Sequence, residues 1–207
     1  PELQQRGLGS YLLQKVGEEE KLAGIDMIGS SFSATQNLLC FWNKAGFSML
    51  RMGFSRDHVT AAHSAVVVKA LNAEGGHIAR VLAEKFQRNL RLWLKGPLSD
   101  LSAEVRAYLL TQLQGDSDKV SEQDRLDIRS FALFNRNYEA CMPAITRWIE
   151  KMDVSQSTLN ERDRDIIGSC VGMNQWSDVV KELGLRGRGQ AVQQLRIVLK
   201  RLLESED

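Results

Sequence analysis

The strand-forming patterns of this 207-residue chain all lie before residue 72, and this division most limits the folds open to it. Before residue 72, helical and strand spacing alternate, whereas every later patterned segment has helical spacing. The sequence therefore predicts an α+β fold, with a small sheet and its helices in residues 1–72 and an all-helical part in residues 73–207. The length is sufficient for two small domains.

The first part is predicted to contain two helices and three strands. Thr35 is placed to cap the second helix, because a threonine hydroxyl accepts a hydrogen bond from the first helical turn. On the first helix, Leu8, Leu12, Leu13 and Val16 share one apolar face. The predicted helices cover residues 8–22 and 38–44, and the predicted strands cover residues 25–32, 46–54 and 64–71.

The second part is predicted to be a series of helices joined by short polar turns. Ser121 and Asp124 form a loose capping box in front of one of them. On the first long helix, a core face is predicted from Ile78, Leu82, Phe86, Leu90 and Trp93. The predicted helices cover residues 78–94, 103–113, 122–134, 138–152, 161–171, 177–183 and 190–203.

The composition excludes several classes of protein. Hydrophobic residues make up 43% and charged residues 26%, the net charge is +1, and no segment is long and apolar enough to cross a membrane. No secretory leader is recognised, and Cys40, Cys141 and Cys170 have neither disulfide-framework nor zinc-site spacing. We therefore expect free cysteines, a cytoplasmic location and no metal.

The segment from Gln4 to Gly9, "QQRGLG", places two glycines directly before the first predicted helix. Glycines allow a tight turn and a close approach of the backbone to a ligand. The first turn of the helix adds unpaired N–H groups and the positive end of the helix dipole. This arrangement fits a pyrophosphate site, although the same pattern also fits a simple turn.

The order of the elements supports the first of these two interpretations. Loop, helix, strand, "ATQNLLCFWNKAGF", strand and strand resemble the second half of a GCN5-related N-acetyltransferase. The glycine signature of that family, Gln/Arg-x-x-Gly-x-Gly/Ala, is matched by Gln4, Gly7 and Gly9. Its later Gly-Phe pair is matched by Gly46 and Phe47. The resemblance implies a partial acetyltransferase sheet.

A narrower resemblance covers essentially the whole chain. "PELQQRGLGSYLL", "GIDMIGSSFSATQNLLCFWNKAGF" and "NQWSDVVKELGLRGRGQAVQQLR" are similar to segments of the bacterial tRNA(Met) cytidine acetyltransferases. The resemblance implies a C-terminal fragment of an enzyme that acetylates N4 of the wobble cytidine of elongator tRNA(Met). It also implies acetyl-CoA as cofactor, tRNA as partner, and ATP hydrolysis in a preceding module. The 207 residues contain no Walker A pattern of their own.

The resemblance also assigns cofactor-binding residues. Backbone N–H groups of the glycine segment would bind the pyrophosphate of acetyl-CoA, and two residues of the following helix, Asn37 and Lys44, stand at further contact positions. The family is expected to have an acidic residue and an arginine there, so both are departures. The residues predicted to bind acetyl-CoA are Gln4, Gln5, Arg6, Gly7, Leu8, Gly9, Ser10, Asn37 and Lys44.

The catalytic acid and base are harder to assign. Trp42 occupies the position of the tyrosine acid of many related acetyltransferases, but an indole N–H cannot serve as that acid, so we expect Trp42 to be a core residue. His58 and His63 lie in or next to the loop between the last two strands and are weak candidates for a general base. Arg56 and Asp57 are expected to order this loop through an ion pair.

The helical part is the predicted tRNA-binding region, although residues 74–207 carry 20 basic and 20 acidic residues. On the first long helix, four basic residues fall within about 80° of one face, and a second basic cluster brackets the last helix. Either group fits phosphate binding or a merely solvated face. The predicted nucleic-acid-binding residues are Arg80, Arg88, Arg91, Lys95, Arg186, Arg188, Arg196, Lys200 and Arg201.

Two alternatives to an RNA acetyltransferase remain open at this point. The chain could acetylate a small amine or a protein, or it could be an inactive binding module.

A missing strand beside residues 25–32 would leave that strand with an open edge, so we expect self-association of this chain.

Overall fold

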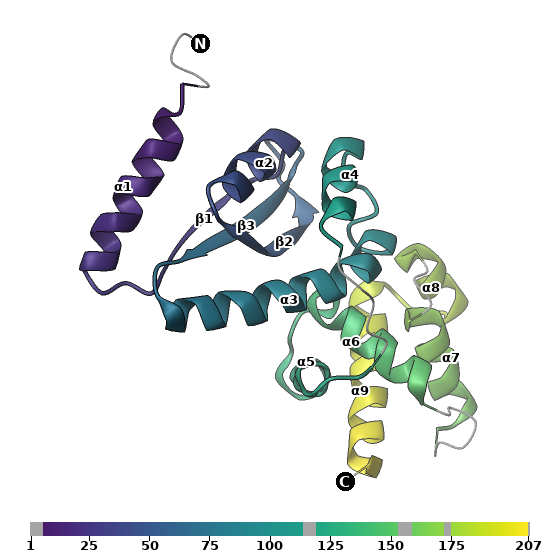
Figure 1. Ribbon diagram of the computed structural model, residues 1–207. Coiled ribbons are helices and arrows are strands. Elements are labelled where there is room, and N and C mark those ends of the chain that lie inside the picture. Colours follow the sequence, from purple (N-terminus) through teal and green to yellow (C-terminus); the bar gives the residue numbers. More distant parts are fainter. Residues whose placement is uncertain (1–5, 114–118, 153–158, 172–174, 207) are drawn as a thin grey trace. The chain divides into compact units, whose positions relative to one another are not determined.

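The computed structural model describes residues 6–113, 119–152, 159–171 and 175–206 (Figure 1). The described residues form two compact units. The first, the sheet unit, contains residues 6–94 and 98–113, and the second, the helical unit, contains residues 95–97 and the described residues from 119 onward. The α+β class predicted from the sequence is confirmed.

The sheet unit is built on three antiparallel strands, β1 (Met27–Ser33), β2 (Ser48–Arg56) and β3 (His63–Ala70), in the order β1-β3-β2. The central strand β3 is rich in valine, which suits a strand with a neighbour on each side. Among the described residues, β1 pairs with β3 alone, so its other edge is open.

Helix α2 (Gln36–Lys44) packs its aromatic residues against the sheet. Its cap is the predicted one, because the Thr35 hydroxyl accepts a hydrogen bond from the Leu38 N–H at 3.3 Å. The Trp42 ring stacks on Phe32 of β1 at 5.8 Å and meets Phe47 edge-on at 4.7 Å. Trp42 is therefore the packing residue that the sequence predicted.

Helices α3 (Ala73–Lys95) and α4 (Ala103–Thr111) also belong to the sheet unit, apart from Lys95. Trp93 packs against Phe54 of β2 and Phe86, with ring centroids 5.5 and 5.8 Å away. The sheet unit thus extends well beyond residue 72. The domain boundary predicted at residue 72 stays a prediction.

The predicted core face of α3 is only half right. Phe86, Leu90 and Trp93 are buried, but Ile78 and Leu82 are 40% and 41% exposed. Gly75, at the start of this helix, is buried, and a Cβ atom there would collide with the carbonyl oxygen of Asp26. The helix therefore approaches Asp26 closely at Gly75, whereas its large apolar residues are buried from Phe86 onward.

Helix α1 (Leu8–Leu22) presents its apolar side to solvent within the described part of the chain. Leu8 and Leu12 are 54% and 63% exposed, and Gly17 is the buried residue of this helix. A Cβ atom at Gly17 would lie 3.6 Å from a methyl group of Leu71. The helix thus approaches the sheet through a glycine rather than through its leucines.

The helical unit contains α5 (Glu122–Phe134), α6 (Tyr138–Lys151), α7 (Glu161–Val171), α8 (Trp176–Glu182) and α9 (Arg188–Glu206). The predicted helices agree with these, with small differences at their ends. Ser121 and Asp124 form a complete capping box at the start of α5. The core of the helical unit includes Phe131, Ile145, Ile166, Leu195 and Leu199, each at most 1% exposed.

Candidate functional site

The glycine segment forms an open turn at the start of α1. Gly7 is the residue before the helix and has a φ of 78°, which favours glycine. A Cβ atom at Gly7 would have no neighbour within 4 Å, and no side chain of the described residues caps the helix. The N–H groups of the first turn thus have no side-chain cap in the described part of the chain, which is a requirement for an anion site. Gln4 and Gln5 lie outside the described residues.

Gly9 has a second role that the sequence did not reveal. A Cβ atom there would lie 3.3 Å from the Phe41 ring of α2, so Gly9 lets α1 begin close to α2. Arg6, Leu8 and Ser10 are exposed around the turn. The two remaining predicted cofactor residues, Asn37 and Lys44, are also exposed, in the first and last turns of α2.

A cavity of about 590 Å³ opens at the start of α2, and we call it the α2 cavity. It lies entirely within the sheet unit. Its walls come from the first turn of α2, the turn between β2 and β3, and the segment that leads into α4. The residues that line it are Ala34, Thr35, Gln36, Asn37, Arg56, Thr60, Ala61, Ala62, His63, Asp100, Leu101, Ser102, Glu104 and Val105.

One wall of the α2 cavity is a network centred on Asp100. The His63 side chain is 2% exposed, and its Nδ1 lies 2.8 Å from the carbonyl oxygen of Gly53. Its Nε2 lies 3.0 Å from one carboxylate oxygen of Asp100, and Arg56 Nε donates to the other at 2.8 Å. Both ring nitrogens of His63 thus face acceptor atoms. This arrangement gives His63 a structural role, and its catalytic role stays a prediction.

The ion pair expected between Arg56 and Asp57 is not formed, because Arg56 pairs with Asp100. Asp57 instead orders the turn by accepting hydrogen bonds from the N–H groups of Val59 and Thr60. The Thr60 backbone bond, followed by its hydroxyl, lowers the pKa of Asp57. His58 lies in the same exposed turn and does not line the cavity, so the two histidines do not come together there.

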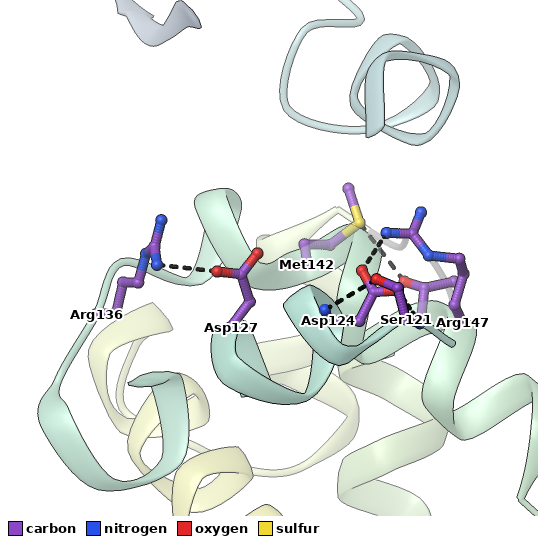
Figure 2. A network of polar contacts seen from close by, with 7 residues as sticks. Ser121, Asp124, Asp127, Arg136, Met142 and Arg147 are labelled. Atoms are coloured by element: carbon purple, nitrogen blue, oxygen red, sulfur yellow. Dashed lines mark hydrogen bonds and ion pairs between the residues drawn. The ribbon is translucent and has the colours of Figure 1, made fainter. Parts of the chain in front are cut away.

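Buried carboxylates of the helical unit are paired with arginines (Figure 2). Asp124 accepts from Arg147 at 2.6 Å, and both side chains are nearly inaccessible, at 3% and 6% exposure. Burial alone would raise the pKa of Asp124, but hydrogen bonds from Arg147 and Ser121 outweigh it and lower the pKa. Asp127 likewise pairs with Arg136 at 2.9 Å.

Two arginines of the predicted nucleic-acid cluster around α9 are paired with carboxylates in the same way. Arg188 pairs with Glu139 and lies over the Trp176 ring, and Arg201 pairs with Asp163 at 2.7 Å. Arg196 is 9% exposed and donates to the carbonyl oxygens of Phe131 and Arg136. Its guanidinium holds two backbone segments together, which gives Arg196 a structural role, and its nucleic-acid role stays a prediction.

The remaining predicted nucleic-acid residues are more accessible. Arg186 is exposed just before α9, and Lys200 lies 3.8 Å from Glu204. On α3, Arg80 pairs with Glu84 at 3.1 Å and Arg88 is half-buried, whereas Arg91 and Lys95 are exposed. Exposed basic residues of α3 thus occur both near its start, at Arg80, and near its end, at Arg91 and Lys95.

Neither a metal-binding cluster nor a helix suited to spanning a membrane occurs in the part of the chain that the structure describes. The sequence offered no signal for Asp100, which lies 37 residues from His63 and in an irregular segment. Its role depends on how the chain folds back, and this is not visible in local spacing.

Comparison with known proteins connects this geometry with an enzyme family. Residues 2–72 match the family model of GNAT acetyltransferase 2. This match contains the glycine turn, α2 and all three strands. A tRNA(Met) cytidine acetyltransferase of Nitrosococcus halophilus is 32% identical over 210 residues, which cover 98% of this chain. The chain is a homologue of the tRNA(Met) cytidine acetyltransferases.

Two further tRNA(Met) cytidine acetyltransferases show the same relationship. The protein of Thermofilum pendens is 28% identical over 89% of this chain, and that of Actinobacillus pleuropneumoniae is 31% identical over 71% of it. The chain spans about a quarter of the length of these relatives, from 24% to 28%. The resemblance drawn from the sequence is confirmed.

Proposed function

We propose that this chain carries the acetyl-CoA turn of an N-acetyltransferase that acetylates cytidine in tRNA. The open glycine turn at Gly7 supports the proposal most strongly, because it lies inside the segment that matches the acetyltransferase family. A helix start with unpaired N–H groups suits the pyrophosphate of acetyl-CoA. Asn37 and Lys44 lie seven residues apart on α2 and so share one side of that helix.

The finer parts of the proposal come from the relatives. The acceptor is proposed to be N4 of the wobble cytidine of elongator tRNA(Met), since the relatives are named for tRNA(Met) and cytidine. ATP hydrolysis is proposed to take place in a region outside these 207 residues. Arg186, Arg91 and Lys95 are the accessible positive residues best suited to hold tRNA phosphates.

Calorimetry with acetyl-CoA and a nucleoside analysis of tRNA test the proposal together. We expect heat of binding that Gly7→Val abolishes, since a β-branched residue at a φ of 78° distorts the turn. Gly24→Val is the matched control, because Gly24 has a φ of 80° and open space but lies at the other end of α1. Incubation of the full-length protein with acetyl-CoA, ATP and tRNA should yield N4-acetylcytidine by mass spectrometry. Acetylation of free amines without acetylation of tRNA would contradict the proposal.

A further inference from the structure

The α2 cavity opens beside the helix that the glycine turn contacts. Gly9 approaches the ring of Phe41, and Asn37, which lines the cavity, precedes Phe41 by four residues. Residues four apart lie on the same side of a helix, about one turn or 5.4 Å along it. If the pyrophosphate of acetyl-CoA binds at the glycine turn, the long chain that carries its acetyl group can therefore reach the cavity.

Two side-chain amides line this cavity without a partner among the described residues. Gln36 and Asn37 are exposed in the first turn of α2, while the neighbouring Thr35 uses its hydroxyl as the helix cap. Each amide offers a donor and an acceptor side by side. This is the complement that binds the hydrogen-bonding edge of a nucleobase.

Two carboxylates line the cavity, and they differ in their hydrogen-bond partners. Both oxygens of Asp100 are engaged, one by His63 and the other by Arg56, so Asp100 is fixed and its charge is balanced. Glu104, in the first turn of α4, has no partner in the described part of the chain. Because the oxygens of Asp100 are engaged and the ring of His63 is held between Gly53 and Asp100, Glu104 is the lining carboxylate that is available to take a proton.

We propose that the α2 cavity binds the acceptor base, that Gln36 hydrogen-bonds its edge, and that Glu104 takes the proton that the acceptor amine loses. This inference rests on the proposed function and adds the acceptor side of the site. The amine nitrogen attacks the thioester carbonyl carbon, the C–N bond forms, and the C–S bond breaks. The CoA thiolate leaves with the electron pair of that bond. The proton of the nitrogen passes to the Glu104 carboxylate and then to the thiolate.

Kinetics of the full-length protein with acetyl-CoA and tRNA test the role of Glu104. We expect Glu104→Gln to lower kcat by about 100-fold or more, within the usual range for loss of a general base. Acetyl-CoA binding and circular dichroism should be unchanged. Glu122→Gln is the matched control, because Glu122 is also an exposed glutamate in a first helical turn but does not line the cavity. A kcat for Glu104→Gln within twofold of that control would overturn the role.

Binding of a nucleotide to the 207-residue chain tests the cavity independently of catalysis. Titration with cytidine 5′-monophosphate should shift the side-chain amide NMR signals of Gln36, and uridine 5′-monophosphate should shift them less. Gln36→Ala should also lower kcat/KM for tRNA by about tenfold, whereas Gln123→Ala on α5 should not. Shifts without tRNA acetylation would refute the proposed function alone. Absence of any shift at Gln36 would refute the cavity assignment even if the full-length protein acetylates tRNA.

Discussion

Replacement of Arg147 by methionine should destabilise the helical unit far more than loss of an exposed ion pair. The variant leaves the Asp124 carboxylate, 3% exposed, without its guanidinium partner, although the Ser121 contacts remain. Removal of one member of a buried pair costs about 3–5 kcal/mol. Whole domains are stable by only about 5–15 kcal/mol, so this loss removes a large fraction of the free energy of unfolding and should speed amide exchange.

Hydrogen exchange measured by mass spectrometry is the suitable assay, because it reports the helical unit separately from the sheet unit. Peptides from residues 119–152 of Arg147→Met should exchange faster by a factor that corresponds to about 3–5 kcal/mol. Arg80→Met is the control, since Arg80 and Glu84 are 60% and 59% exposed and such a pair contributes about 0–1 kcal/mol.

A double variant separates charge burial from the loss of contacts. Asp124→Asn together with Arg147→Met removes both charges, while the amide oxygen of the new asparagine can still accept the hydrogen bond from the Ser121 N–H. We expect it to recover part of the stability lost in the single variant, which gives a coupling energy for the pair. The reasoning would be refuted if Arg147→Met exchanged no faster than Arg80→Met, or if the double variant were the least stable of the three.

Three further predictions concern other parts of the chain. Burial raises the pKa of the Cys170 thiol from 9.0 to about 11, so the folded state keeps a proton that the unfolded chain loses. Stability should fall by roughly 1–3 kcal/mol between about pH 9 and pH 11, and urea titrations of Cys170→Ala should show a smaller fall. Arg91→Glu with Lys95→Glu should weaken tRNA binding and lower the slope of log K against log salt by roughly 0.7–0.9 per lost contact. An unchanged slope in a filter-binding assay would mean that these residues only form a solvated face. The open edge of β1 should promote self-association, and light scattering should detect it as a mass that rises with concentration. A monomer at all concentrations, with residues 27–33 protected from exchange, would exclude it.

The sequence predicted most of the elements because their signals are local. The Thr35 cap, the Ser121–Asp124 capping box and the limits of α5 and α7 each depend on residues within one or two turns. The contacts that the sequence did not predict join distant residues. Gly75 lies against the backbone of Asp26, and Arg196 donates to carbonyl groups about 60 residues earlier.

The candidate site divides in the same way. The glycine turn was visible as a pattern, since its conformation depends on Gly7 and on the helix that follows. The α2 cavity was not visible, because Asp100 and Glu104 come close to the start of α2 only when the chain folds back, and local spacing does not reveal this. The family resemblance predicted the reaction and the cofactor. The fold showed that Gln36, Asp100 and Glu104, which the resemblance had not indicated, line the cavity.

The strand order β1-β3-β2 has a consequence for how the sheet assembles. The β2–β3 pairing joins neighbours in the chain, so this hairpin closes a short loop and forms on the microsecond scale. The partner of Met27, in contrast, is Ala70, and that loop includes α2 and the whole hairpin. During synthesis, β1 therefore emerges well before its only described partner. We expect the hairpin to nucleate the sheet and β1 to add last, onto an already formed β3.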